Sequence, residues 1–420
     1  MKLQIRNLAR VHEASIDING ITVVAGYNST GKSTISKAFV ACLQAYSQMA
    51  VQISNQRFIN MVRTIQDITL EALPSTMLIG RDDGVEELSK KIIELPSYMP
   101  SKDDFISALE GELDEHEHKI LLSYLDNNFD AIIKEIEKKK AVSNQEYASF
   151  IVTRKFREIF DQQINTFGSH EISTVDFSGE KENIHIEISD NRASICPVLN
   201  LKEKPPIYIE PRHILDESAS RHIFSIRSSS SFYRELIDDE SNRASLTLDQ
   251  YNQREHASNI VKALASDVMH GHLQPHDNTV SFYDDDFQED VSVRNVASGI
   301  KSMALIARLV ENGHLPLHGL LVIDEPEVNL HPAWQLKFAN FLVLLNKELD
   351  IQILLTTHSP YFLKAIETYS KHYDNFKELK LYVTEQVTSE KQHKMYTVKD
   401  VTNDSNVIFK QLYLPLEEIL

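Results

Sequence analysis

Short apolar runs without polar alternation stand near both ends of the chain, at residues 21–25, 320–323 and 351–355. Such runs are typical of parallel strands that are covered on both faces. The first two runs are followed by helical stripes, in which apolar residues recur every three or four positions. The stripes are Ile35, Phe39, Leu43 and Tyr46, and then Trp334, Phe338, Phe341, Leu342 and Leu345. The pattern predicts an α/β fold in which distant segments share one sheet.

The middle of the chain has a different pattern. Residues 105–164 are highly charged and favour helices, but they sustain no series of apolar a and d heptad positions. Residues 171–195 alternate as half-buried strands do, and residues 207–209 are typical of a core strand. We therefore expect a short helical lobe or arm, rather than a long coiled coil, followed by strands. The serine-rich stretch 225–236 predicts an ordered or gated loop.

The length of 420 residues is too great for one compact core, because single cores stop growing at roughly 250–300 residues. We expect one large α/β domain with a mixed sheet, interrupted by a largely helical insertion. Residues 1–50 form its first part, and residues 51–206 are a mainly helical insertion with a strand-rich end. Residues 207–289 return to the domain with the gated loop, and residues 290–420 complete it.

Charge and composition exclude some classes of protein. The net charge of −18 disfavours nonspecific nucleic-acid binding by the whole surface, but it does not exclude one basic face. No apolar run approaches the ~20 residues of a membrane helix, and the N-terminus lacks a signal-peptide layout. We expect a cytoplasmic protein without membrane contact. Cys42 and Cys196 lie far apart and fit buried structural thiols.

The stretch GYNSTGKST, residues 26–34, follows the first apolar run and opens the first helical stripe. It satisfies G-x-x-x-x-G-K-[ST], and in a strand–loop–helix context the backbone N–H groups and the helix N-terminus hold nucleotide phosphates. Lys32 then reaches the β- and γ-phosphates, and Ser33 holds Mg²⁺. The alternative is a glycine turn that matches by chance. The predicted ATP-binding residues of this loop are Gly26, Asn28, Ser29, Thr30, Gly31, Lys32, Ser33 and Thr34.

Two carboxylates, Asp324 and Glu325, end the second apolar run. Open α/β sheets bind ligands at the carboxyl ends of their strands. Asp324 suits a Mg²⁺ ligand, and Glu325 suits a general base that polarises an attacking water. The third run ends in TTHSP, which places His358 at the same edge, where its imidazole would bridge the γ-phosphate and the water. The alternatives are an acidic helix cap and a structural histidine.

A serine and a glycine, Ser298 and Gly299, begin a further helical run. A helix N-terminus binds anions. Because the chain already has one phosphate loop, we expect this second helix end to bind the γ-phosphate of a nucleotide held by another molecule. A plain N-cap is the alternative, and the segment taken alone favours it. The acidic stretch 284–290 just before it predicts a solvated hairpin.

The order of these motifs resembles the ABC-type ATPase heads of the SMC, RecF and OLD-like group. The resemblance rests on GYNSTGKST, ASGIKS, LLVIDEPEVNLHP and LLTTHSP, and it covers residues 1–50 and 290–420. More narrowly, the chain is similar to compact bacterial ATPases of anti-phage systems, such as PtuA of Septu and AriA of PARIS. The resemblance implies a homodimer, or a higher even oligomer, whose heads sandwich two ATP molecules. Ser298 and Gly299 then contact the γ-phosphate of the other subunit.

Two departures from this group narrow the expected function. OLD nucleases continue into a TOPRIM domain, for which residues 359–420 are too few, and SMC proteins carry long heptad arms. We therefore expect a Mg-ATP-dependent ATPase that regulates a separate effector, a nuclease in bacterial anti-phage defence. The alternative is a DNA- or RNA-engaging repair or recombination ATPase of RecF type, which would need a basic face. The long stretch between phosphate loop and signature disfavours a transporter subunit.

Overall fold

The computed structural model divides the chain into two compact units. The first, here called the head unit, comprises residues 1–47, 154–194 and 203–420, and the second, the helical unit, comprises residues 48–153 and 195–202. The predicted gated loop at 225–236 lies outside the described residues. The structure describes the whole chain except residues 74–82, 96, 110–112, 114, 166–170, 181, 196–200, 202–204, 211–245, 277–278, 388–393 and 418–420, and except the side chains of residues 267, 276, 279, 294, 298 and 414–417.

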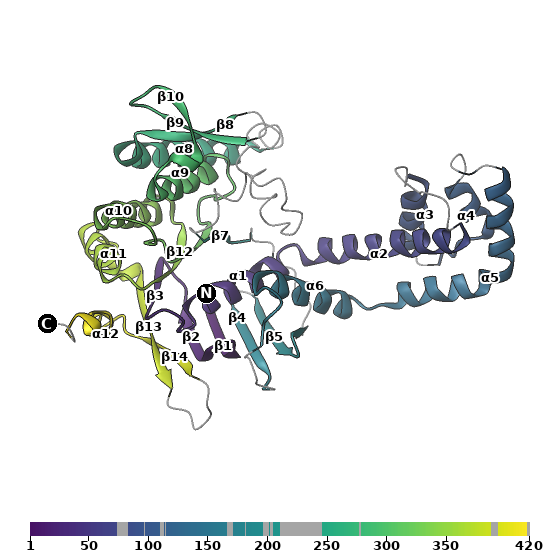
Figure 1. Cartoon of the computed structure of the whole chain (residues 1–420), viewed down its shortest axis with the longest axis horizontal. Coiled ribbons are helices and arrows are strands. Elements are labelled where there is room, and N and C mark those ends of the chain that lie inside the picture. The colour runs from purple at the N-terminus through teal and green to yellow at the C-terminus, as the bar shows by residue number, and fades with distance from the viewer. Residues whose placement is uncertain are drawn as a thin grey trace. The chain divides into compact units, whose positions relative to one another are not determined.

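The head unit contains the predicted parallel strands and the helices that follow them (Figure 1). Its elements are β1 (Lys2–Leu8), β2 (Val11–Asp17), β3 (Ile21–Ala25), α1 (Lys32–Tyr46), β4 (Ser173–Ser178), β5 (Asn183–Ser189), β6 (Arg192–Ile195), β7 (Ile207–Ile209), α8 (Leu248–Met269), β8 (Gly271–His276), β9 (Thr279–Asp284), β10 (Glu289–Ser292), the 3₁₀ turn η3 (Val293–Asn295), α9 (Ser298–Glu311), β11 (Leu320–Asp324), α10 (Pro332–Leu349), β12 (Gln352–Thr357), α11 (Pro360–His372), η4 (Phe376–Glu378), β13 (Leu379–Val387), β14 (Met395–Asp400) and α12 (Asn406–Glu417).

Eleven strands of the described chain form one mixed sheet, in the order β6-β5-β4-β1-β2-β14-β13-β3-β12-β11-β7. The five strands from β13 to β7 run parallel to one another. Beyond β13 the pairs widen the sheet and are antiparallel, except that β14 and β2 are parallel. In the parallel part, Asp324 pairs with Thr356 and Ala25 pairs with Thr357. The segments that follow β3, β11 and β12 therefore meet at one edge, and the predicted α/β class is confirmed.

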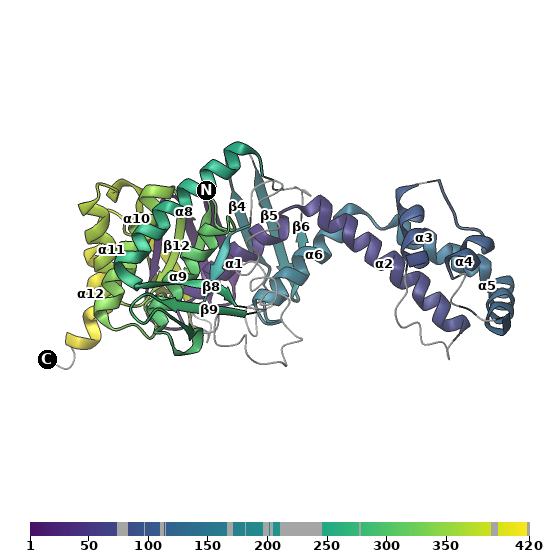
Figure 2. The ribbon, with the colours of Figure 1, turned by 90° about the horizontal axis from the view of Figure 1, so that it is seen from above.

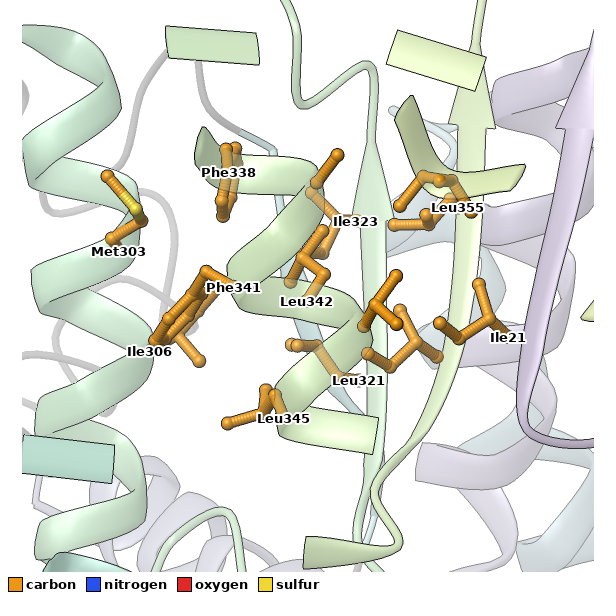
Figure 3. Close-up of a cluster of buried hydrophobic side chains, with 14 of the residues drawn as sticks. Ile21, Met303, Ile306, Leu321, Ile323, Phe338, Phe341, Leu342, Leu345 and Leu355 are labelled. Atoms are coloured by element: carbon orange, nitrogen blue, oxygen red, sulfur yellow. The ribbon is translucent and has the colours of Figure 1, made fainter. Parts of the chain in front are cut away.

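Helices cover both faces of the parallel strands (Figure 1). On one face, side chains of β3, β11 and β12 pack against α9 and α10, and Figure 3 shows their apolar side chains together. Leu321, Ile323, Phe338 and Leu342 are fully buried there. On the other face α1 packs against β11 and β12, with Ile35 completely buried. Since full burial of such a side chain is worth about 1.5–3 kcal/mol, this core holds the edge of the sheet in place.

The helical unit consists of helices that pack on one another and have a core of their own (Figure 2). α2 packs against α3 and α5, and α4 packs against the same two helices. Ile65, Leu88, Phe105 and Leu125 are among the buried residues. The helices are α2 (Met49–Ala72), α3 (Asp83–Glu94), α4 (Lys102–Ala108), α5 (Glu115–Ala141) and α6 (Asn144–Ile159), the last of which continues into the head unit.

The strand-rich stretch after the helices does not belong to the part of the fold that the sequence boundaries predict. The sequence pattern assigns it to the insertion at 51–206, whereas β4 pairs with β1, with Phe177 opposite Leu3, in the sheet of the head unit. Alternation identifies a strand, but it does not identify the strand that pairs with it. The hairpin predicted at 284–290 is present as β9 and β10. None of the helices in the described part of the chain is both long and apolar enough to cross a membrane.

Candidate active site

The phosphate loop joins β3 to α1 and uses backbone conformations that few residues adopt. Gly26, Ser29 and Gly31 have φ angles of 155°, 64° and 91°. A Cβ atom on Gly26 would lie 1.9 Å from the hydroxyl oxygen of Thr384, so only glycine fits. The loop predicted at residues 26–34 therefore stands where a phosphate cradle requires it, between a buried strand and a helix N-terminus.

A chain of hydrogen bonds connects this loop to the C-terminal part of the head unit. The Thr384 hydroxyl donates to the Thr30 hydroxyl at 2.8 Å, and that hydroxyl donates to the Tyr27 carbonyl at 2.8 Å. The Tyr27 hydroxyl donates to the backbone carbonyl of Gln411 on α12. The Gln411 side-chain amide donates in turn to the Thr384 carbonyl at 3.0 Å. β13 and α12 thus help to fix the loop.

Lys32 is the first residue of α1, and its side chain is only 3% exposed. Its Nζ donates to the Tyr27 carbonyl at 2.7 Å and lies 3.7 Å from Glu325 Oε1. Burial lowers the pKa of Lys32, and the charges of Glu325, Glu327 and Asp324 oppose this shift. The site therefore contains a desolvated cation next to carboxylates.

Asp324 is the last residue of β11 and Glu325 follows it directly, at the strand end that the sequence predicts. Asp324 is buried, and its carboxylate accepts a hydrogen bond from the Thr356 hydroxyl. Glu325 has a left-handed backbone conformation, with φ of 51°, and its N–H donates to the Thr356 carbonyl at 3.1 Å. This turn separates the two carboxylates, so that they leave the strand in different directions.

His358 lies beside these acids, in the segment between β12 and α11. Its Nδ1 is 3.5 Å from Glu325 Oε1 and 3.3 Å from Glu327 Oε1. The Glu325 carboxylate raises the pKa of His358, against the opposite effect of burial. The structure thus brings Lys32, Asp324, Glu325 and His358 together from three neighbouring parallel strands.

Several residues of the site were missed by the sequence analysis. Glu327 is a third, buried carboxylate, and the sequence signal for it was the second acid of DEPE. Thr356 precedes His358 in TTHSP, and its hydroxyl orients Asp324. Tyr208 of β7 is paired with Val322, and its hydroxyl is buried with no hydrogen-bond partner in the part of the chain that the structure describes. Burial, together with the charges of Asp324, Glu210 and Glu325, raises the pKa of this phenol. No sequence pattern pointed to Tyr208.

The predicted signature opens α9. Ala297 is the N-cap and Ser298 the first helical residue, so the backbone does not make Ser298 the N-cap. The contacts of Gly299 are with the segment after Glu325, because a Cβ there would lie 2.9 Å from Leu330 Cδ2 and 3.6 Å from Trp334 Cε3. Gly299 therefore lets α9 approach the stretch EVNLHP closely.

The residues around Lys32 suit a magnesium-bound nucleotide. The helix N-terminus and the buried ammonium favour phosphates, while the Ser33 hydroxyl and the Asp324 carboxylate are hard oxygen ligands. Within the described residues, no group of three or more His, Cys, Asp or Glu side chains could hold a metal ion. Mg²⁺ needs no such group, since it is usually bound by one or two carboxylates and the phosphates of a substrate.

The chain is similar to known proteins in sequence and in structure. The chain is 26% identical over 207 residues to a protein of Escherichia coli called "Retron Ec83 probable ATPase". That match covers 45% of this chain and 36% of the relative, so the chain spans about a third of the relative's length.

Solved structures give weaker similarities. The SMC head domain from Thermotoga maritima aligns over 95% of this chain and 98% of that one, at 10% identity and a TM-score of 0.40. An SMC head bound to the C-terminal winged-helix domain of ScpA aligns over 97% and 98%, at 10% identity and a TM-score of 0.46. The sequence profile of the family described as "AAA domain, putative AbiEii toxin, Type IV TA system" matches residues 21–364, so the chain belongs to this family.

Proposed function

We propose that the chain binds and hydrolyses Mg-ATP between two heads of a dimer, and that this cycle regulates a separate effector protein. The observation that carries the proposal is the meeting of Lys32, Asp324, Glu325 and His358 at one edge of the sheet. These four side chains have the chemistry that phosphate binding and water activation require.

In the proposed reaction, the backbone N–H groups of the loop and the Lys32 ammonium hold the β- and γ-phosphates. Glu325 accepts a proton from the attacking water, and the adjacent His358 orients that water against the γ-phosphate. Ser33 and Asp324 would hold Mg²⁺, which neutralises phosphate charge when it is bound. The hydrogen bond from Thr356 fixes the direction of Asp324.

The dimer is proposed because the signature helix begins beside the segment that follows Glu325. α9 has its N-terminus at Ser298, and Gly299 packs against Leu330 and Trp334. A second head that offers this helix end to the γ-phosphate would complete the charge environment of the site. Ser298 and Gly299 are then the residues that act across the interface.

The effector is proposed to be a nuclease in bacterial anti-phage defence. Support comes from the family description, which names a putative toxin, and from the relative called a retron probable ATPase. We further propose that the chain is closest in kind to the compact ATPases PtuA of Septu and AriA of PARIS. Purified chain with Mg-ATP should then leave plasmid DNA intact, and cleavage should require the product of a second gene.

Mixing two inactive variants tests the shared site. Ser298→Arg leaves the phosphate loop intact and puts a bulky cation at the proposed interface, whereas Lys32→Ala leaves the signature intact. In the mixed dimer, one composite site has both an intact loop and an intact signature. We expect ATPase activity to recover partly when the two proteins are mixed, as measured by phosphate release.

Ser292→Arg is the matched control, because it adds the same charge at an exposed serine of β10. It should retain wild-type turnover. Ser298→Arg protein that is fully active alone, and monomeric at every concentration in light scattering, would contradict the sandwiched dimer.

A further inference from the structure

Glu327 is a buried carboxylate on the loop between β11 and α10, and its side chain is 3% exposed. One of its oxygens, Oε1, accepts three hydrogen bonds: from the Thr357 hydroxyl at 2.7 Å, from the His358 N–H at 2.8 Å and from the Ser359 N–H at 3.2 Å. All three donors belong to the turn that joins β12 to α11. Glu327 therefore ties the loop after the catalytic acids to the turn that contains His358.

Burial alone would make a carboxylate unfavourable at this position. Burial does raise the pKa of Glu327, and the hydrogen bonds from His358 and Thr357 oppose this shift. Successive backbone N–H groups aimed at one oxygen form an anion-binding nest, and the N-terminus of α11 adds positive charge. The arrangement is therefore built to hold one oxygen of Glu327 at a fixed place, whereas Oε2 is buried with no hydrogen-bond partner among the described residues.

The imidazole of His358 faces the same oxygen. Nδ1 lies 3.3 Å from Glu327 Oε1 and 3.5 Å from Glu325 Oε1, without a completed hydrogen bond to either. The two ring nitrogens flank Cε1 and point in different directions, so an Nδ1–H that faces a carboxylate leaves Nε2 for another partner. Glu327 is fixed by three donors, while Glu325 also lies within 3.7 Å of Lys32 Nζ. Glu327 is thus the better-fixed of the two acceptors for Nδ1–H.

We infer that Glu327 is the positioning residue of His358: it holds the turn at 357–359 and accepts the Nδ1–H proton, so that Nε2 is presented to the γ-phosphate. Glu325 then stays available to the attacking water. The inference rests on the proposed role of His358 at the γ-phosphate. Glu327 itself touches neither the phosphate nor the water.

Two substitutions at Glu327 distinguish the positioning of His358 from a part in proton transfer. Glu327→Ala removes the acceptor, so His358 should lose its Nδ1–H preference and turnover should fall roughly 10- to 100-fold, as is usual when the partner of a functional histidine is removed. ATP affinity should change less than turnover. Glu327→Gln keeps an oxygen that accepts from the same donors, so it should retain the Nδ1–H form and lose less than about fivefold in turnover. Its melting temperature should fall, because the amide NH₂ replaces the unpartnered Oε2.

Glu367→Ala is the matched control. Glu367 is an equally buried carboxylate on α11, and it accepts hydrogen bonds from Lys364, Lys371 and Ser405. Its loss should lower stability without changing the state of His358. The imidazole is observed by ¹⁵N NMR of histidine-labelled protein, and because the chain has 17 histidines, the His358→Gln variant identifies the signal.

The ¹⁵N NMR measurement of His358 is made without nucleotide, so its result would not change if the proposed dimer or the proposed effector were wrong. Glu327→Ala protein that keeps both the Nδ1–H form and wild-type turnover would overturn the inference. So would Glu327→Gln protein that loses as much turnover as Glu327→Ala, because Glu327 would then take part in proton transfer. If Glu327→Ala does not fold, the Glu327→Gln variant decides. Retention of the Nδ1–H form and of turnover supports the inference, and a hundredfold loss of turnover refutes it.

Discussion

At the scale of single residues, Lys32 shows how the site is prepared for an anion. Its ammonium has lost nearly all of its water, and its near neighbours are the Tyr27 carbonyl and the Glu325 carboxylate. The lowered pKa of Lys32 means that burial outweighs the attraction of the three nearby acids. Phosphate oxygens would supply the stronger hydrogen bonds that this buried charge lacks.

Substitutions at Lys32 and Glu325 should therefore have different effects. Lys32→Ala should weaken ATP binding roughly 10- to 100-fold, as expected for the loss of one or two hydrogen bonds to a charged group. Glu325→Gln should keep ATP affinity but lose ~10² or more in turnover, because it removes the general base. Binding is measured with a fluorescent nucleotide and turnover by phosphate release.

Lys37→Ala is the control for the first substitution, since it removes the same charge from α1 outside the loop. ATP affinity of Lys32→Ala within twofold of wild type would refute the phosphate site. Unchanged turnover in Glu325→Gln would mean that Glu325 is not the general base, and His358 would be the next candidate.

The residues that the sequence could predict are those whose role follows from their place at a strand end. Asp324 directly follows one apolar run and His358 follows another after two threonines, and parallel strands align their carboxyl ends. Glu327, Thr384 and Tyr208 could not be predicted in this way. Glu327 and Thr384 act through partners far away in sequence, as when Thr384 bonds to Thr30, and Tyr208 is placed by the pairing of β7 with β11. No local periodicity encodes such contacts.

At the scale of elements, periodicity predicted the type of element better than its place. The run 21–25 is β3 residue for residue, and the helix predicted after Lys32 is α1. Strands β4 to β6 were also recognised as strands. The pairing of β4 with β1 crosses about 170 residues, and a two-residue alternation contains no information about such a partner.

α12 provides a prediction at this scale, because it contacts the phosphate loop. Tyr27→Phe removes the hydrogen bond to the Gln411 carbonyl, so the loop loses one of its fixed points. A hydrogen bond contributes about 0.5–1.5 kcal/mol, so ATP affinity should fall roughly two- to tenfold if the loop must be ordered to bind. Isothermal titration calorimetry measures the change.

Tyr361→Phe is the control, since it removes an exposed tyrosine hydroxyl from α11. It should leave the affinity unchanged. If Tyr27→Phe binds ATP as tightly as wild type, α12 does not support the loop.

At the scale of the whole molecule, the net charge of −18 sets an expectation for nucleic acid. Long-range repulsion opposes binding, so any contact with DNA must come from a local basic region. Each neutralised phosphate contributes a slope of about −0.9 to log K against log salt, which is about 3.5-fold per contact between 50 and 200 mM. We expect weak binding that disappears over this range in fluorescence anisotropy.

Poly-dT and duplexes of unrelated sequence serve as controls and should bind alike. A sequence-specific complex that is insensitive to salt would contradict the expectation and would favour a repair ATPase of RecF type.

The position of β3 in the sheet has a consequence for how the protein is made on the ribosome. Ile21 pairs with Ile353 of β12 on one side and with Leu379 of β13 on the other. At roughly 5–20 residues per second, these partners are synthesised about 15 to 70 seconds after β3. The helices of residues 48–153 have their partners close in sequence and can fold meanwhile, whereas β3 has two open edges on an apolar strand. The nascent chain therefore cannot complete the ATP site around its first-made segment until β12 and β13 have been synthesised.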